Sequence, residues 1–387
     1  MKSDARFFLL ISLVGGFAIL SSTMSKTPVL PLFAEALKAT PAEIGWIVMA
    51  STIPGVLASY PAGVLSDMLG KRRLLIASLV VFATAPFLYL LVHTPWQLMA
   101  VRFYHGFATA IFGTVAIAAI AERYVADRAA RISTYSSITI VGRSVAPFLG
   151  GALISLASFH AVYLACAVSG VIAFAAGLLL HDGHDTRAPR RELPRFWPSL
   201  VAVLKDRGIL RVSLVEAAQY LVFGAVEAFL ALYASSLGIP AWQIGVILGV
   251  QLVSIVFAKP VMGRISDRVG RTAVIVPGLF VGAASVALLI FAQSFVSLAL
   301  LSLLFGIGFA TVTSSTTALV ADLTKNGRFG SSMGVLRTVM DVGQSIGPVL
   351  TGFIVTHLGY ASAFGTLAAI LVLASLLLGA LPRAATP

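Results

Sequence analysis

The chain has 387 residues, of which 58% are hydrophobic and only 11% are charged. Because soluble domains carry about 25% charged residues, this composition argues against a soluble enzyme and a disordered chain. The net charge of +12 would suit a nucleic-acid binder, so the positions of the basic residues have to decide what the charge does. The single cysteine, Cys166, excludes a disulfide framework and a cysteine metal site.

Apolar runs separated by short polar loops indicate membrane-spanning helices, each of which needs about 20 apolar residues. The first run follows Lys2 and Arg6 but continues beyond the length of a signal peptide, so we expect an uncleaved first span. The sequence therefore predicts an all-α membrane protein with twelve transmembrane helices. Their ranges are 7–33, 42–62, 74–92, 96–120, 132–156, 160–180, 209–236, 241–262, 273–292, 295–320, 331–355 and 360–381.

The lysines and arginines are distributed unevenly between the two sides of the predicted membrane. Of the 27, 20 lie at the termini or in the loops of one side, and only Lys38 lies on the other; six lie within or at the edges of spans. Loops rich in Lys and Arg face the cytoplasm. We therefore expect a cell (inner) membrane protein with both termini cytoplasmic, whose basic charge faces anionic lipid. No nucleic-acid partner is expected.

The sequence repeats itself at an offset of about 200 residues. Residues 63–71 align with 263–271 at an offset of 200, as do Gly106 with Gly306 and Glu122 with Asp322; at 201, Gly142, Pro147 and Gly151 align with Gly343, Pro348 and Gly352. Parallel repeats of this kind are one architecture of secondary transporters. We predict an N-terminal six-helix half at 1–180, a cytoplasmic linker at 181–207 and a C-terminal half at 208–387.

Three motifs carry a resemblance to a known family. The first is G-x-x-x-D-x-x-G-[KR], which occurs twice, as Gly63, Asp67, Gly70, Lys71, Arg72 and Arg73 and as Gly263, Asp267, Gly270 and Arg271. The second is R-x-x-H-G at 102–106, and the third is the fifth-span pattern with Gly142, Pro147, Gly150 and Gly151. Together they resemble the major facilitator superfamily, in its twelve-span drug/proton antiporter branch. The third departs from the family pattern, because Ala146 replaces a glycine and Arg143 lies within it.

The doubled loop motif has a mechanical interpretation. A carboxylate such as Asp67 at a helix end can cap a helix N-terminus or pair with an arginine. The resemblance implies a partner near the start of the eleventh span, around 331–337, in a contact that forms and breaks during transport. Asp267 would form the weaker second copy. The alternative is a basic loop that only sets the membrane topology.

Ionisable residues within spans cost about 2.5–3.5 kcal/mol each at a helix centre, so they usually face a cavity or a partner. The candidates for proton coupling are Glu227, Asp341, Arg102 and Glu216. Glu227 could couple protons, form an ion pair with Lys26, or face the lipid headgroups or a loop. Glu216 could extend to the lipid headgroups or pair at a gate. Arg337 and Asp341, four residues apart, could neutralise each other.

The candidates for the substrate cavity are polar and aromatic residues of the predicted spans. They are Lys26, Arg102, His105, Arg143, Gln219, Phe223, Glu227, Arg337, Asp341 and Gln344. The resemblance implies that Arg102 helps couple protonation to substrate binding. The proton is the expected coupling ion, and no cofactor or metal is expected.

These observations predict a secondary transporter that exports a small hydrophobic or amphipathic compound by proton-coupled alternating access. Uptake of a small organic anion is one alternative, and a non-transporting membrane receptor or scaffold is another. The sequence has no Walker loop and no H-E-x-x-H or G-x-S-x-G motif, which argues against an ATP-driven pump and an enzyme. The expected partners are a small-molecule substrate and the lipid bilayer, with the protein a monomer.

Overall fold

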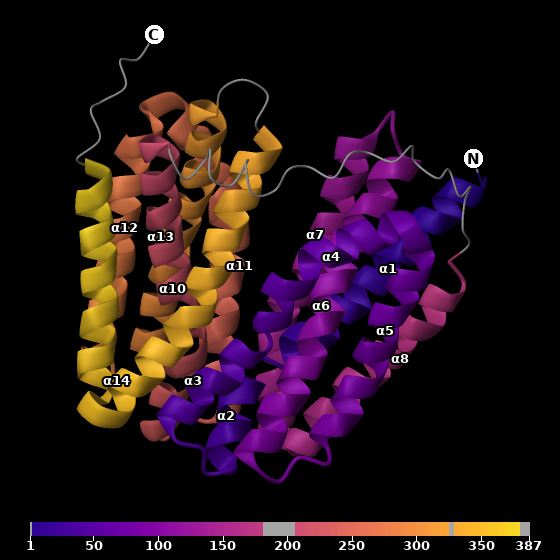
Figure 1. Cartoon of the computed structure of the whole chain (residues 1–387). Coiled ribbons are helices and arrows are strands. Elements are labelled where there is room, and N and C mark those ends of the chain that lie inside the picture. The colour runs from indigo at the N-terminus through magenta and orange to yellow at the C-terminus, as the bar shows by residue number, and fades with distance from the viewer. Residues whose placement is uncertain (1, 181–205, 325–328, 380–387) are drawn as a thin grey trace. The chain divides into compact units, whose positions relative to one another are not determined.

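The computed structural model describes residues 2–180, 206–324 and 329–379, and every regular element within these ranges is a helix (Figure 1). The described residues form two compact units. Unit 1 contains the residues up to 180 together with Pro240–Gly249, and unit 2 contains the remainder. The predicted linker, 181–207, lies outside the described residues except for its last two.

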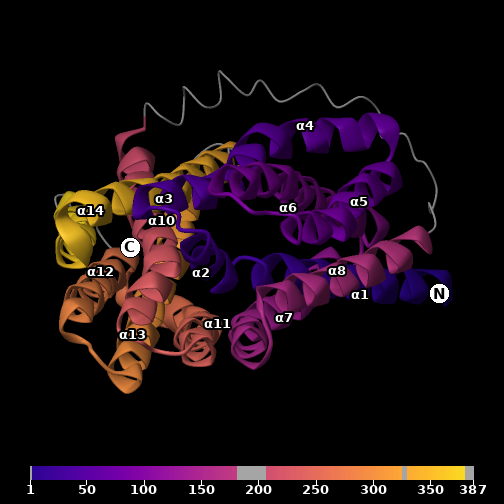
Figure 2. The same cartoon turned by 90° about the horizontal axis from the view of Figure 1, so that it is seen from below.

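Unit 1 contains the helices of the first six predicted spans. They are α1 (Lys2–Met24), α2 (Val29–Ala36), α3 (Pro41–Ala50), α4 (Ile53–Leu69), α5 (Lys71–Tyr89), α6 (Pro95–Arg123), α7 (Arg128–Leu156) and α8 (Phe159–Leu178). Helix α1 packs against α7 and α8, and α5 packs against α6 and α8 (Figure 2). Buried apolar side chains such as Ile11, Leu79, Phe82 and Phe112 form the core between them.

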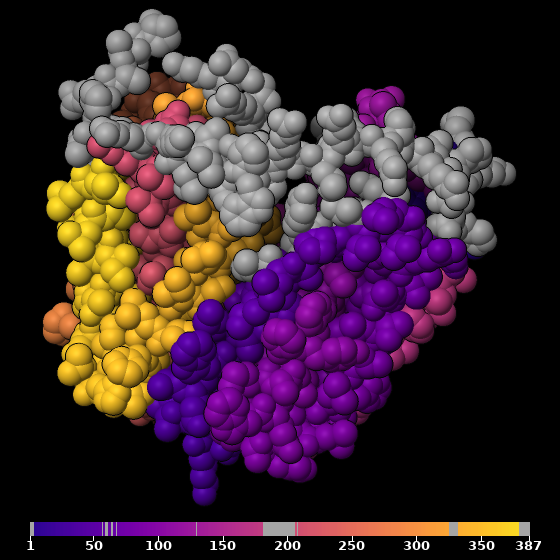
Figure 3. Space-filling model, viewed as in Figure 1, coloured from indigo at the N-terminus to yellow at the C-terminus, as the bar shows by residue number. Residues whose placement is uncertain are grey.

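The later helices are longer and less interrupted. They are α10 (Arg207–Ser236), α11 (Ala241–Val269), α12 (Arg271–Leu288), the short 3₁₀ helix η1 (Leu289–Phe291), α13 (Phe295–Leu323) and α14 (Phe329–Gly379). Helix α14 packs along α10, and their side chains are in contact (Figure 3). A methyl group added at Gly343 or Gly347 would overlap the carbonyl oxygens of Ala217 and Leu221. Small residues four apart therefore allow these two helices to approach closely.

The two halves of the chain share their helix ends, as the sequence repeat predicts. Helices α6 and α13 begin and end at aligned positions, and both begin with a capping box, at Thr94 and at Ser294. Gly70 and Gly270, which end α4 and α11, both have positive φ angles, of 90° and 103°. Glycine adopts this conformation without the steric cost that a Cβ imposes, so the motif glycines allow the turn into the next helix.

Ten helical segments of the described chain are long and apolar enough to cross a membrane. This establishes a multi-pass helical protein, while the count of twelve spans stays a prediction. The predicted span 42–62 is divided between α3 and α4, neither of which reaches 18 residues. The described parts of the predicted spans 331–355 and 360–381 lie largely in one helical segment, Ser332–Leu378, which is interrupted at Gly359, where φ is 78°.

Proline explains why helices of unit 1 are broken where their counterparts are continuous. The break between α1 and α2 contains Pro28, which aligns with Ala228 inside α10. The break between α3 and α4 is followed by Pro54, which aligns with Ser254 inside α11. Proline lacks a backbone N–H and its ring clashes with the preceding turn, so it is tolerated in a first turn and disfavoured in a helix interior.

Candidate functional site

Glu216 lies on α10 and is fully buried within unit 2. Its Oε2 atom is hydrogen-bonded to Thr316 of α13, and its Oε1 atom has no hydrogen-bond partner among the described residues. The ammonium of Lys259 on α11 interacts with it electrostatically. Full burial rules out the interpretation that Glu216 extends to the lipid headgroups, because such a side chain would have to remain accessible.

The Thr316 hydroxyl is shared between two acceptors. It lies 2.9 Å from the carbonyl oxygen of Val312 and is also hydrogen-bonded to Glu216 Oε2. A hydroxyl has one hydrogen, so it can donate fully to only one of them at a time. A protonated Glu216 would supply the second hydrogen and satisfy both contacts. This arrangement can therefore accommodate a neutral carboxylic acid more fully than a carboxylate ion.

Further buried polar atoms of the same two helices have no hydrogen-bond partner within the described ranges of the chain. Ser213 and Gln219 stand three residues before and after Glu216 on α10, and Thr313 and Ser315 stand close to Thr316 in sequence on α13. Residues three apart share a helix face. Buried polar atoms are normally paired with protein or with ordered water. This polar strip can therefore hold water or a polar group of a ligand.

An aromatic cluster follows the polar strip along the same helices. Tyr220 and Phe223 of α10 lie four and seven residues beyond Glu216, and both contact Phe309 of α13. The ring centroids of Phe223 and Phe309 are 4.4 Å apart. An apolar aromatic surface beside a buried carboxyl group is suited to a compound with both apolar and polar parts.

Unit 1 contains a buried cationic cluster instead. The Arg102 guanidinium on α6 donates to Ser51 Oγ at 2.7 Å and to Tyr89 Oη at 3.2 Å. Tyr89 Oη also lies 3.2 Å from His105 Nδ1, and the Tyr89 ring stacks on Tyr163 with centroids 4.4 Å apart. All except Ser51 are almost fully buried. The structure thus brings together the predicted pair Arg102 and His105, with Tyr89 between them.

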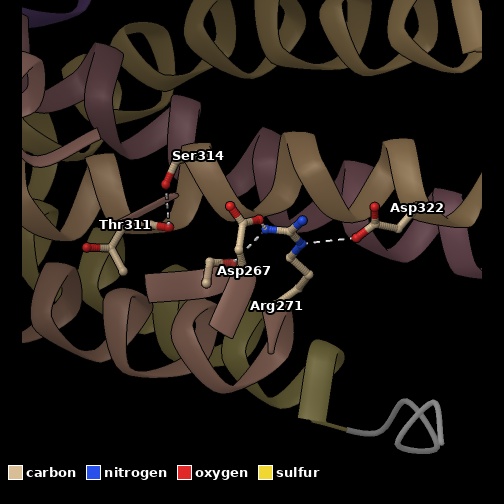
Figure 4. Close-up of polar contacts among 6 residues, drawn as sticks. Asp267, Arg271, Thr311, Ser314 and Asp322 are labelled. Atoms are coloured by element: carbon tan, nitrogen blue, oxygen red, sulfur yellow. Dashed lines mark hydrogen bonds and ion pairs between the residues drawn. The ribbon is translucent and has the colours of Figure 1, made fainter. Parts of the chain in front are cut away.

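The basic loop residues form ion pairs at aligned positions in the two halves. Lys71 Nζ lies 2.6 Å from Glu122 Oε1, and Arg271 Nε lies 3.0 Å from Asp322 Oδ2. Arg271 is also paired with Asp267, so that it lies between two aspartates (Figure 4). Each pair links the start of one helix to the end of another within the same half. These contacts show how the loop motif fixes local helix packing.

Other residues of the loop motif contact backbone carbonyl groups, are exposed, or have side chains that the structure does not describe. Arg72 donates to the carbonyl oxygens of Leu178 and Leu180 at the end of α8, which are favourable partners for a cation. Arg73 is exposed. The side chains at 63 and 67 lie outside those that the structure describes, so the predicted contact of Asp67 with residues 331–337 remains a prediction.

The remaining predicted cavity residues occupy varied positions. Lys26 lies in the turn between α1 and α2, and Glu227 is half-buried on α10. Arg143 is exposed on α7, whereas Gln344 is half-buried on α14. Arg337 and Asp341 form the ion pair that their spacing predicts, at 3.9 Å, with the arginine side chain 77% exposed. The roles of all these residues in transport remain predictions.

The fifth-span glycines take part in close helix packing. A methyl group at Gly142 of α7 would stand 3.0 Å from the carbonyl oxygen of Gly16 in α1. One at Gly150 would stand 3.0 Å from a side-chain carbon of Val29 in α2. Pro147 lies inside α7. The pattern therefore has a packing function whether or not the protein is an antiporter.

Sequence reasoning missed several residues that the structure shows to be important. Glu122 and Asp322 could have been recognised, because the repeat aligns them just as it aligns their partners Lys71 and Arg271. Tyr89, Tyr163 and Thr316 carried no such signal. Their significance comes only from contacts between helices that are distant in the sequence.

The helical repeat, the doubled loop motif and the buried charged groups define a class of protein, the secondary transporters built from two repeated helical halves. A model of the Major Facilitator Superfamily matches residues 11–250 and 212–387. The chain therefore belongs to the Major Facilitator Superfamily, and it is a multi-pass membrane transporter.

Curated relatives cover most of the chain at low identity. An uncharacterized MFS-type transporter of Methanocaldococcus jannaschii is 24% identical over 343 residues, 87% of this chain and 88% of that protein. The quinolone resistance protein NorA of Staphylococcus aureus is 23% identical, with 84% of each chain covered. The multi-drug resistance efflux pump PmrA of Streptococcus pneumoniae is 24% identical, with 92% of this chain and 91% of that protein covered.

Solved structures show the same fold. The crystal structure of the nucleoside transporter NupG is similar with a TM-score of 0.79 and 15% identity, covering 97% of this chain and 98% of that one. A variant of NupG gives a TM-score of 0.83 at 14% identity. At such low identity the similarity is evidence for the fold alone.

Proposed function

We propose that this protein exports small hydrophobic or amphipathic compounds in exchange for protons, and that Glu216 carries the coupling proton. The observation that carries the proposal is the complete burial of Glu216. One of its oxygens has no hydrogen-bond partner in the described part of the chain, and the other lies beside a shared threonine hydroxyl. An ionised carboxylate in such a place is costly, whereas the neutral acid is not. A buried carboxyl group ionises more readily once it is exposed to water, so exposure of Glu216 during the transport cycle would release its proton, which is the property that coupling requires.

The nature of the substrate rests on two observations. Tyr220, Phe223 and Phe309 form an aromatic cluster close along the helices to Glu216. NorA and PmrA are named for quinolone resistance and multi-drug efflux. The aromatic cluster supports an apolar or amphipathic compound, and the names of these relatives support transport out of the cell.

Glu216→Gln tests the coupling role, because glutamine keeps the size of the side chain but cannot carry the proton. A fluoroquinolone is added to the medium outside everted vesicles that have an acidic interior. Its accumulation inside the vesicles is then followed. We expect driven accumulation to be lost in Glu216→Gln, while the shift in unfolding temperature on adding the fluoroquinolone is retained. Unchanged driven accumulation would remove Glu216 from the mechanism.

Two adjacent threonines provide a matched control. Thr316 contacts Glu216, whereas the Thr317 hydroxyl donates to the carbonyl oxygen of Thr313 in its own helix. Thr316→Val should slow driven accumulation and Thr316→Ser should restore it, while Thr317→Val should have little effect. Equal slowing by both valine variants would indicate a general packing defect instead.

Uptake of a small organic anion is a second candidate function. The observation that favours it is Arg102, which is almost fully buried and forms no ion pair with a carboxylate in the described part of the chain. Right-side-out vesicles with an inward proton gradient distinguish the two functions. Accumulation of an organic anion there, with no fluoroquinolone transport in everted vesicles, would establish uptake in place of export.

A further inference from the structure

The buried cluster around Arg102 in unit 1 has more hydrogen-bond donors than acceptors. Three of its polar atoms are buried and have no hydrogen-bond partner in the described part of the chain: Arg102 Nε, His105 Nε2 and Tyr163 Oη. Tyr89 links the three residues, because it is hydrogen-bonded to Arg102 and His105 and stacks on Tyr163. The unpartnered atoms thus belong to one connected group of side chains.

The hydrogen bonds of Tyr89 determine which of these atoms are donors. Arg102 Nη1 donates to Tyr89 Oη, since a guanidinium has only donors. The hydroxyl hydrogen of Tyr89 is then available for His105 Nδ1, 3.2 Å away. A neutral imidazole that accepts at Nδ1 carries its hydrogen on Nε2. His105 Nε2 is therefore an unpartnered donor, like Arg102 Nε, and the Tyr163 hydroxyl can donate as well.

The charge of the cluster is also uncompensated. The contacts of Arg102 among the described residues are with the neutral groups Ser51 and Tyr89. Ser51 is the residue at the C-terminal end of α3, where the helix dipole contributes only about half a negative charge. A buried guanidinium without a counter-charge is costly. Unpartnered donors together with an uncompensated positive charge are the features that an anion satisfies.

The second half of the chain lacks these features at the aligned positions. Arg102 aligns with Ser302, Ser51 with Gln251, and the Ser302 hydroxyl donates to Gln251 Oε1 at 3.1 Å. His105 and Tyr89 align with Phe305 and Leu289, and Tyr163 aligns with Phe364 at the offset of 201. The neutral version of this site thus needs no ligand, which shows that the fold does not itself require a cation there.

We propose that unit 1 binds a small monovalent anion, such as chloride or a short carboxylate, at the cluster formed by Arg102, His105 and Tyr163. The anion accepts hydrogen bonds from the unpartnered donors and compensates the guanidinium charge. It is bound within one half of the protein, and this inference is independent of the direction of transport and of the role of Glu216.

The test is thermal unfolding of the purified full-length protein in sodium chloride against sodium gluconate at equal ionic strength. Chloride should raise the unfolding temperature saturably, because a ligand that binds the folded state stabilises it. Potassium chloride should give the same shift as sodium chloride. Formate in place of chloride shows whether the site also accepts a carboxylate. A parent protein that responds to neither chloride nor formate would overturn the proposal.

Tyr163→Phe gives the sharpest comparison, because it removes one donor without removing any hydrogen bond seen within the protein. In gluconate, Tyr163→Phe should be as stable as the parent or more stable, since a buried unpartnered hydroxyl is lost. Its half-saturating chloride concentration should rise about tenfold, the effect of losing one hydrogen bond to a charged group. An unchanged chloride response in Tyr163→Phe would refute the assignment of this hydroxyl and with it the site.

Two further variants test the cation itself, with Arg102→Gln removing it and Ser302→Ala serving as the control. Arg102→Gln should abolish the chloride shift, and Ser302→Ala, at the aligned position of unit 2, should leave it unchanged. If Arg102→Gln does not fold, the Tyr163→Phe result decides alone. A failure of the proton-coupling proposal would appear in the vesicle assay and leave these unfolding measurements unaffected.

Discussion

The two units share one framework but differ in the charge that they bury. Unit 1 holds the cation Arg102 in its fourth predicted span, and unit 2 holds the acid Glu216 in its first. Glu216 and its partner Thr316 align with Gly16 and Ala116, which are apolar. The comparison teaches that the two halves share a helix arrangement, whereas each has a polar cluster that the other lacks.

The halves also differ in helix continuity. A substitution that tests this difference should have the largest effect on the stability of the protein. Ala228 is buried in the continuous helix α10 at the position that aligns with Pro28. Ala228→Pro should cost about 3 kcal/mol or more, because proline removes a hydrogen bond and clashes with the preceding turn. The measurement is the yield of folded protein in membranes and its unfolding temperature.

Ala228→Gly is the control for this change, because it keeps the backbone N–H and should cost only about 1 kcal/mol. A proline variant as stable as the glycine variant would show that the break between α1 and α2 does not depend on proline.

A substitution at the close contact between α10 and α14 should have an intermediate effect on stability. Gly347, which faces the carbonyl oxygen of Leu221, aligns with Ala146 in α7 at the offset of 201. Gly347→Ala should cost about 1–3 kcal/mol through overpacking. Ala146→Gly should cost about 1 kcal/mol, the difference in helix propensity.

Unfolding temperatures of both variants provide the test, with Gly365→Ala as a control because a Cβ there would meet nothing within 4 Å. A stable Gly347→Ala variant would mean that the two halves pack their aligned helices at the same separation.

Removal of the loop ion pairs should have the smallest effect on stability. Glu122 and Asp322 are about half exposed, at 51% and 55% of their side chains, and exposed pairs contribute about 0.2–1 kcal/mol. Glu122→Gln and Asp322→Asn should therefore lower the unfolding temperature slightly, and less so at high salt, because salt screens exposed charges.

Arg271→Ala should have a larger effect than either of these variants, since it leaves both Asp267 and Asp322 without this partner. Equal effects of Arg271→Ala and Asp322→Asn would show that the contact with Asp267 contributes nothing measurable.

The sequence by itself determined the class of protein, the repeat and the positions of most helix ends. Apolar runs, capping residues such as Thr94 and Ser294, and the glycines at 70 and 270 are local signals, and local physics is sufficient to interpret them. The repeat could also have paired Lys71 with Glu122, because both residues recur at the same offset.

Only the tertiary structure decided which charged residues are buried and what they contact. Glu216 and Glu227 lie on one helix within one predicted span, and the sequence favours Glu227 for proton coupling. Burial instead distinguishes Glu216, and it is set by the packing of α13 against α10. Tyr89, Tyr163 and Thr316 acquire their significance from neighbours that are 13 to 100 residues distant in the sequence. Such contacts depend on how helices pack against each other, and hydropathy along the chain carries no information about that packing.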